Sequence, residues 1–148
     1  MNLKEKLQTE LKEALRSGDN VRKNTIRMAM SSIKLAEVEK GSELDEQGFI
    51  SIIQKEIKIR QEAIQDAQKA GRTDLLANNQ DEVKILESFL PKQLSEDEIK
   101  EMTMSVIAEV QAVSPTDMGR VMKTLLPRVQ GRAPNDQVSR IVRQLLTK

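Results

Sequence analysis

The chain has 148 residues, with 24 Lys and Arg, 23 Asp and Glu, and neither cysteine nor histidine. Without cysteine the sequence predicts no disulfide and no thiolate zinc site, and without histidine it lacks the usual general base near neutral pH. No apolar run approaches the roughly 18 residues that cross a bilayer, and the first residues lack the apolar segment of a signal peptide. These features predict a cytoplasmic protein without a membrane partner.

The N-terminal part predicts four helices, because apolar residues recur at helical spacing. Asn2 and Glu5 have the spacing of a capping box at the start of the first helix. Aspartate or asparagine precedes the next two helices, and a glycine follows each of the first three. The predicted ranges are 3–17, 20–40 and 46–70.

The fourth helix is predicted to begin with Thr73 as its cap and to end before Pro91. A polar stretch over residues 78–82 interrupts its apolar pattern. Asn79 and Glu82 have the spacing of another capping box, so a separate, later helix is the alternative.

The next part opens with a strong local signal. Ser95 and Glu98 form an S-x-x-E capping box, and Leu94 and Ile99 occupy the two positions of a hydrophobic staple. We therefore predict a boundary just after Pro91 and a helix that stops before the next proline.

The last two predicted helices meet at a corner of glycine and proline. The first begins near Met118, and Pro127 is expected to end or kink it. Gly131 is expected to supply a left-handed corner, and the final helix spans about 135–146. No stretch alternates with period two, so the sequence predicts an all-α protein with two domains, 1–91 and 92–148.

Charge is distributed unevenly along the chain. From Asp117 onward there are seven Lys or Arg against two Asp, whereas the first 116 residues carry 17 basic and 21 acidic side chains. Such polarity suggests a polyanionic partner for one end. If the last two helices are antiparallel, six cations can share one surface that suits phosphates. These candidate tRNA-binding residues are Arg120, Lys123, Arg128, Arg132, Arg140 and Arg143. The alternative is the ordinary solvated face of amphipathic helices.

The aromatic residues restrict the kind of nucleic acid. Phe49 and Phe89 are the only aromatics, and both occupy predicted core positions. Readers of single strands stack bases on aromatic side chains, so such a platform is not expected here. We expect recognition of a folded or double-stranded RNA by shape and backbone charge, and no DNA partner.

A second basic group, in the N-terminal part, is interpreted as a solvated helix face, with an anion site as the alternative. Its members are Lys55, Lys58, Arg60 and Arg72.

No motif of a known catalytic class occurs, and carboxylates are scattered along the helices. The sequence therefore predicts no catalytic residues, no metal and no cofactor.

Several segments resemble one family. They are the run 55–62, the run Gly71-Arg72-Thr73-Asp74-Leu75, the run 89–95, Met118-Gly119-Arg120-Val121-Met122, and Gly131-Arg132-Ala133. In this order they resemble the GatB/YqeY domain family, specifically its free-standing YqeY-like proteins. The resemblance implies a helical bundle followed by a three-helix domain. That domain is similar to the tail of GatB, a component of the tRNA-dependent amidotransferase in which the tail is a tRNA-contacting appendage.

Together these arguments predict a tRNA-binding accessory protein that recognises folded tRNA and has no catalysis of its own. Its protein partner would be an amidotransferase or an aminoacyl-tRNA synthetase. The alternative is a helical adaptor that binds such an enzyme without RNA.

Overall fold

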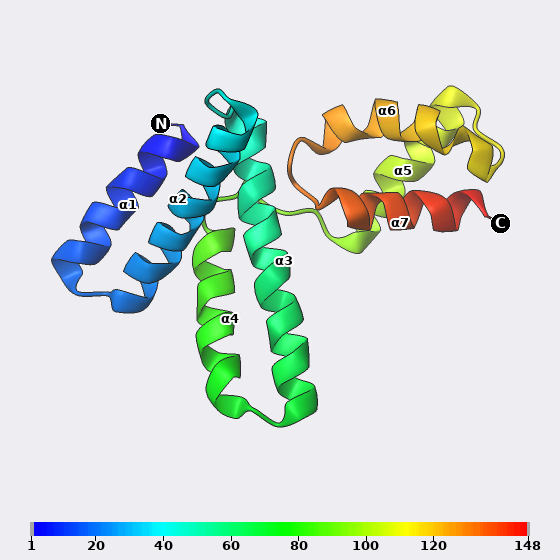
Figure 1. The fold of residues 1–148 in the computed structure, drawn as a ribbon. Helices are drawn as coiled ribbons and strands as arrows, with labels where there is room; N and C mark the ends of the chain where they lie inside the picture. The colour runs from blue at the N-terminus through cyan, green and yellow to red at the C-terminus, as the bar shows by residue number, and fades with distance from the viewer. Residues whose placement is uncertain (1, 148) are drawn as a thin grey trace. The chain divides into compact units, whose positions relative to one another are not determined.

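A computed structural model describes residues 2–147, and this range contains seven α-helices, one short 3₁₀ helix and no strand, which confirms the all-α prediction (Figure 1). The chain forms two compact units, Met1–Leu90 and Pro91–Lys148. Within residues 2–147, no helix combines the length and apolarity that a membrane span requires.

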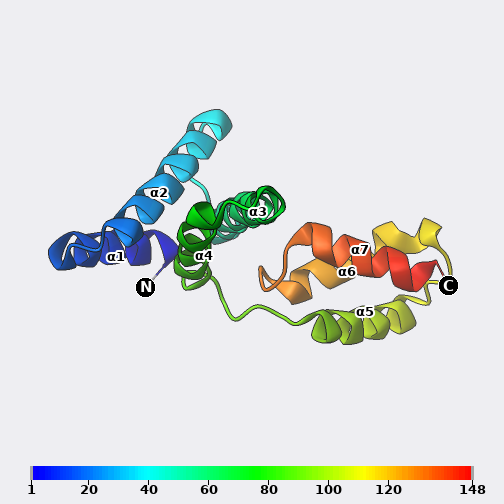
Figure 2. The same cartoon turned by 90° about the horizontal axis from the view of Figure 1, so that it is seen from below.

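The first unit contains α1 (Leu3–Ser17), α2 (Asn20–Lys40), α3 (Glu46–Ala70) and α4 (Thr73–Glu87). Helices α3 and α4 are antiparallel neighbours, and α1 and α2 diverge from the turn at Gly18 and Asp19 (Figures 1 and 2). Ile26, Ile53 and Leu86 are completely buried in the core that these helices share. Burial of each such side chain stabilises the unit by about 1.5–3 kcal/mol.

Local sequence explains most helix ends in this unit. Asn2 and Glu5 form the predicted capping box, with the Asn2 Oδ1 accepting from the Glu5 amide at 2.8 Å. Left-handed glycines follow α1, α2 and α3, as predicted.

The start of α4 differs from the prediction. Arg72 occupies the cap position without a side-chain capping bond to the helix backbone, and Thr73 is already the first helical residue. The polar stretch 78–82 does not interrupt α4, so the alternative of a separate helix is wrong. Leu86 lies on the buried side of α4, and its packing holds the helix together through a stretch with little apolar pattern of its own.

Phe89 anchors the segment that follows α4. Its ring is buried, with the Lys6 Nζ 5.6 Å and the Arg22 guanidinium carbon 6.0 Å from the ring centroid. The Lys6 Nζ also donates to the Ser88 carbonyl at 2.8 Å. These cation–π contacts tie the end of α4 to α1 and α2.

The second unit contains α5 (Glu96–Val110), the 3₁₀ helix η1 (Pro115–Asp117), α6 (Met118–Val129) and α7 (Asn135–Leu146). Helices α6 and α7 run side by side, and α5 lies behind them in Figure 1 and beneath them in Figure 2. The predicted capping box is present, with the Ser95 Oγ accepting from the Glu98 amide at 3.1 Å.

Pro127 was expected to end or kink its helix. It does not end it, because α6 continues to Val129. Proline removes the hydrogen bond that its own amide would make and crowds the carbonyl four residues earlier, and here the helix finishes within its next turn. The corner then uses two left-handed residues, Gln130 with φ of 50° and the predicted Gly131 with φ of 75°.

Candidate nucleic-acid interface

The core of the second unit determines which side chains of α6 and α7 face outward. Val121, Leu125 and Val129 are buried along α6, and Val138 and Ile141 are buried along α7. Helical periodicity directs the charged residues between them toward solvent. Five of the six candidate cations are exposed or partly exposed on these helices and their corner, and Arg132 is half-buried.

Arg120 contacts both an acidic neighbour and the end of α5. Its guanidinium donates to the Asp117 carboxylate at 3.0 Å and to the Val110 carbonyl at 3.0 Å. The Asp117 carboxylate also accepts from the Val113 amide at 2.9 Å. The Val113 hydrogen bond, followed by the Arg120 guanidinium, holds the pKa of Asp117 below its usual value. Arg120 therefore closes the connection between α5 and α6.

Two further candidates pair with carboxylates of α5. The Arg128 guanidinium lies 2.6 Å from the Glu109 carboxylate, and that of Arg140 lies 3.6 Å from Glu96. All four side chains are about half exposed. Exposed pairs of this kind contribute about 0–1 kcal/mol, so a phosphate can replace the carboxylate at low cost.

Arg132 caps the C-terminus of α6. Its Nη2 donates to the Arg128 carbonyl at 2.7 Å and its Nε to the Val129 carbonyl at 3.1 Å. The Arg132 carbonyl in turn accepts from the Leu94 amide at 2.7 Å, which ties the corner to the segment before α5. The last carbonyls of a helix lack partners within it, so these donors satisfy them.

Lys123 and Arg143 differ from the other four. Neither side chain has a hydrogen bond or ion pair with another residue of the described range. Counted from the corner, Lys123 lies seven residues before Gln130 and Arg143 nine residues after Pro134. In antiparallel helices this difference of two residues corresponds to only about 3 Å along the axis. The two cations without partners thus lie at nearly the same level of α6 and α7.

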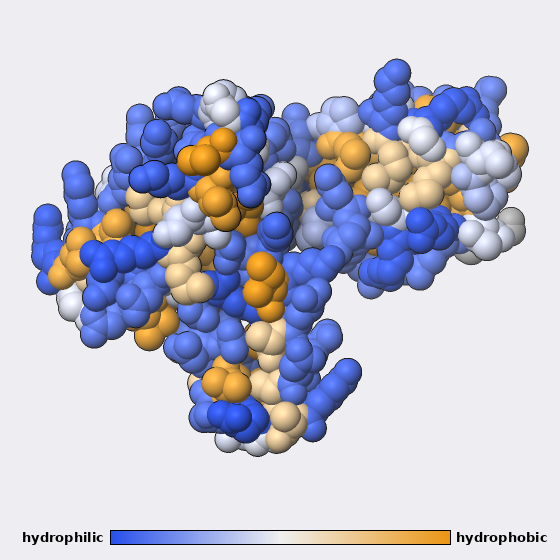
Figure 3. All heavy atoms as spheres, in the orientation of Figure 1, coloured by the Kyte–Doolittle hydropathy of each residue, from blue (hydrophilic) through white to orange (hydrophobic). Residues whose placement is uncertain are grey.

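The surface of α6 and α7 is not uniformly polar. Figure 3, in which α5 lies behind, shows a band of apolar side chains across these two helices with hydrophilic groups on both sides. Met122 and Leu126 of α6 are half-buried against the unit's core. A partner that meets this face would find an apolar strip with cations beside it.

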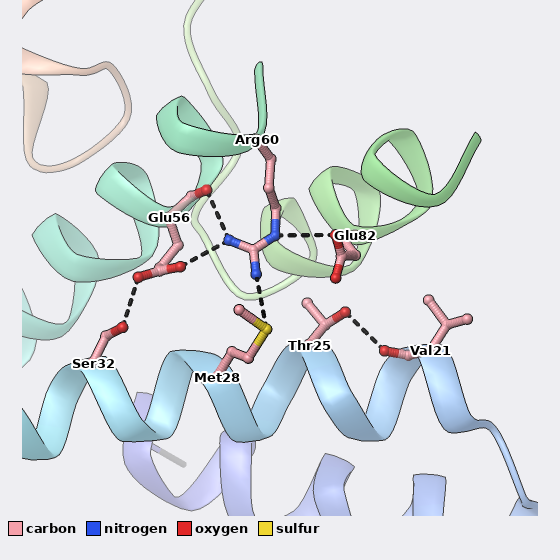
Figure 4. Close-up of polar contacts among 7 residues, drawn as sticks. All are labelled: Val21, Thr25, Met28, Ser32, Glu56, Arg60 and Glu82. Atoms are coloured by element: carbon pink, nitrogen blue, oxygen red, sulfur yellow. Dashed lines mark hydrogen bonds and ion pairs between the residues drawn. The ribbon is translucent and has the colours of Figure 1, made fainter. Parts of the chain in front are cut away.

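In the second basic group Lys55, Lys58 and Arg72 are exposed, as a solvated face requires, but Arg60 is buried (Figure 4). Its guanidinium lies 2.8 Å from the Glu56 carboxylate, and its Nε lies 3.5 Å from that of Glu82 in α4. Glu56 also accepts from the Ser32 hydroxyl of α2 at 2.6 Å. The interpretation of Arg60 as solvated is therefore wrong. It forms a structural link among α2, α3 and α4.

The remaining pKa shifts also belong to structural contacts. The Ser95 amide and hydroxyl hold the pKa of Glu98 below its usual value, as the capping box requires. The Arg72 side chain lowers the pKa of Asp74. Residues 2–147 contain no group of three or more acidic side chains arranged to hold a metal ion.

The sequence predicted the exposed positions of the cations but not their carboxylate partners. Asp117 stands three residues before Arg120, a spacing that indicates a pair on a helix. Glu96 and Glu109 carry no comparable signal, because they belong to a different helix from Arg140 and Arg128.

Comparison with known proteins identifies relatives of the whole chain. The model of a family described as Yqey-like protein matches residues 4–146. The chain is similar to proteins named altered inheritance of mitochondria protein 41, mitochondrial. One, from Lachancea thermotolerans, is 31% identical over 113 residues, which cover 74% of this chain and 60% of that protein. That from Kluyveromyces lactis is 32% identical over 114 residues, covering 74% and 61%. That from Pyrenophora tritici-repentis is 27% identical over 144 residues, covering 95% and 79%.

These relatives correct one expectation. The chain spans about three fifths of the length of the first two, and all three are named as mitochondrial. Their names contradict the predicted cytoplasmic location. That prediction depended on the absence of a signal peptide and a membrane span, and neither feature distinguishes the cytoplasm from the mitochondrion.

Proposed function

Because the chain belongs to the YqeY-like protein family, we propose that its second unit binds folded tRNA, as an accessory module without catalysis of its own. The observation that carries the proposal is the pair Lys123 and Arg143, two exposed cations without an intramolecular partner in the described range. Following the names of the relatives, we propose a mitochondrial location for this activity.

The charges of the second unit favour one direction of approach. Helix α5 contains five Asp or Glu and one Lys, whereas α6 and α7 contain five Lys or Arg and one Asp. A phosphate backbone is repelled by α5 and attracted by α6 and α7. The tRNA body therefore approaches α6 and α7 and not α5.

The candidate cations contribute in two ways. Lys123 and Arg143 meet phosphates directly, whereas Arg128 and Arg140 first release exposed carboxylates. Arg120 and Arg132 remain engaged with backbone carbonyls, and they hold the framework that presents the other four. Phosphate contacts of these four cations would give a slope of log K against log salt of about −3 to −4.

The test is binding of total tRNA and of double-stranded DNA with equal charge, measured by fluorescence anisotropy over a salt series. We expect tighter binding of tRNA and a steep salt dependence. The double substitution Lys123→Gln with Arg143→Gln should make the slope shallower by about 2. The matched control, Lys92→Gln with Lys100→Gln, removes the same charge outside α6 and α7 and should leave the slope nearly unchanged.

Two outcomes would contradict the proposal. One is the absence of tRNA binding, and the other is an equal loss of slope in the control and in the Lys123 and Arg143 variant. Salt-insensitive capture of an amidotransferase or a synthetase, without tRNA binding, would favour the helical adaptor instead.

A further inference from the structure

A groove lies between α1 and α2 of the first unit, remote in sequence from the cations of α6 and α7. Its volume is about 510 Å³, and its lining comes chiefly from the first half of α1 and the second half of α2, away from the turn that connects them. Volumes of roughly 300–1,000 Å³ are typical of small-molecule sites. The chemistry of its walls and floor decides which ligand it can hold.

The floor of the groove is apolar. Leu7 of α1, Met30 and Ile33 of α2 and Phe49 of α3 contribute to it. Leu7, Ile33 and Phe49 are only 2%, 6% and 7% exposed, so they are recessed below the walls. An alkyl chain is apolar along its whole length and suits such a floor, and the flexible Met30 side chain can adapt to its path.

The α2 wall carries Arg27, Ser31 and Lys34, which follow one another at helical spacing along the groove. Arg27 and Lys34 are exposed, and their side chains have no hydrogen bond or ion pair with another residue in the range 2–147. Ser31 places a hydroxyl between them.

The opposite wall and the end of the groove add little negative charge. Lys4 of α1 lines the groove and lies 3.9 Å from the exposed Glu43. Glu37 is the acidic residue in the lining, and its carboxylate already accepts from the Leu44 amide at 3.0 Å. Three cations thus surround an apolar floor against one engaged carboxylate.

We infer that this groove binds a single-chain amphiphile with an anionic head, of the chemistry of a free long-chain carboxylate. The alkyl chain lies over Leu7, Ile33 and Phe49, where it is removed from water. The carboxylate lies against the α2 wall that carries Arg27, Ser31 and Lys34. Arg27 offers a planar pair of donors that matches a carboxylate, and the Ser31 hydroxyl adds another donor. This site is independent of RNA binding by the second unit.

The test is isothermal titration calorimetry of the full chain with monomeric laurate. We expect saturable binding of one laurate per chain, with weaker binding of 1-dodecanol and of dodecyltrimethylammonium. Arg27→Gln with Lys34→Gln should weaken laurate binding by at least about tenfold, since charge-assisted hydrogen bonds to the carboxylate are lost. The matched control, Lys12→Gln with Lys40→Gln, removes the same charge from exposed positions of α1 and α2 outside the groove and should change binding less than about twofold.

Blocking the groove gives a second test that spares the core. Ser31 is exposed, so Ser31→Trp should fill the groove and abolish laurate binding while circular dichroism shows an unchanged helix content. Three results would each overturn the inference. They are binding of dodecyltrimethylammonium as tight as that of laurate, equal weakening in the control and in the Arg27 and Lys34 variant, and unimpaired laurate binding by the Ser31→Trp variant. No saturable laurate binding would overturn it as well, and it would leave the groove to a macromolecular partner. Binding of anionic vesicles without binding of monomeric laurate would identify a membrane surface and likewise reject the free carboxylate.

Discussion

The Arg60 guanidinium in α3 lies 2.8 Å from the carboxylate of Glu56, one helical turn earlier, and their side chains are only 5% and 12% exposed. Glu82 of α4 contributes a second carboxylate, 3.5 Å from the Arg60 Nε. This Nε has no hydrogen bond within the described range, so the Glu82 contact is an ion pair without good hydrogen-bond geometry. Two poorly hydrated carboxylates therefore have one guanidinium as their shared counter-charge.

We predict that Arg60→Ala lowers the free energy of unfolding by about 3–5 kcal/mol, because it leaves buried carboxylates without a counter-charge. Urea denaturation followed by circular dichroism measures the effect. Arg72→Ala is the control, since Arg72 pairs with Asp74 on the surface, and it should produce no measurable change. Equal stability of the two variants would show that the buried pair contributes nothing.

Gln111 ends α5 in a left-handed conformation, with φ of 57°. A side chain in this region costs roughly 1–2 kcal/mol that glycine avoids, so we predict that Gln111→Gly stabilises the second unit by about 0.5–1 kcal/mol. Thermal denaturation provides the measurement. Ser105→Gly, at an exposed position inside α5, should do the opposite by a similar amount because glycine weakens a helix interior. A loss of stability in both variants would contradict the assignment of Gln111 as a left-handed cap.

Asp117 should titrate below its usual pKa of 3.8, chiefly because its carboxylate accepts from the Val113 amide. A pKa lowered by folding means that the carboxylate stabilises the folded unit above its ordinary pKa. This contribution is lost as the pH falls through the lowered value. Arg120→Gln should raise the pKa only part of the way, since the Val113 hydrogen bond remains. Carboxyl titration by nuclear magnetic resonance measures this pKa. A complete return to 3.8 in the Arg120→Gln variant would contradict the prediction, because it would assign the whole shift to Arg120.

Arg132 should matter for folding more than for RNA binding. Arg132→Lys replaces the planar guanidinium that reaches two carbonyls of α6, and we predict a loss of about 1 kcal/mol in stability. Lys123→Gln is the comparison, and it should leave the melting temperature unchanged because its side chain makes no such contact. If Arg132→Lys melts like the wild type but binds tRNA weakly, its principal role is at the RNA.

Much of the helical layout follows from short-range chemistry. The capping pairs Asn2 with Glu5 and Ser95 with Glu98 place helix starts correctly, since each involves residues three apart. Glycines place helix ends for the same local reason. Local rules were less decisive where packing dominates. The fourth helix continues through its polar stretch, as its main prediction has it, whereas α6 continues past the proline expected to end or kink it.

The candidate site shows a similar division. Periodicity correctly predicts that Lys123 and Arg143 face solvent, because the apolar stripe of each helix must face the core. The interpretation of Arg60 as solvated was wrong, because its carboxylate partners lie on two elements and α2 covers them. Whether the exposed cations bind tRNA stays a prediction.

The sequence by itself therefore determined the helices, their caps and the outward direction of most charges, because these depend on residues within one or two turns of each other. Only the tertiary structure decided which cations are already paired. Arg128 meets Glu109, and Arg140 meets Glu96, across separate helices. An ion pair depends on distance through space, and the packing of helices sets that distance independently of separation along the chain.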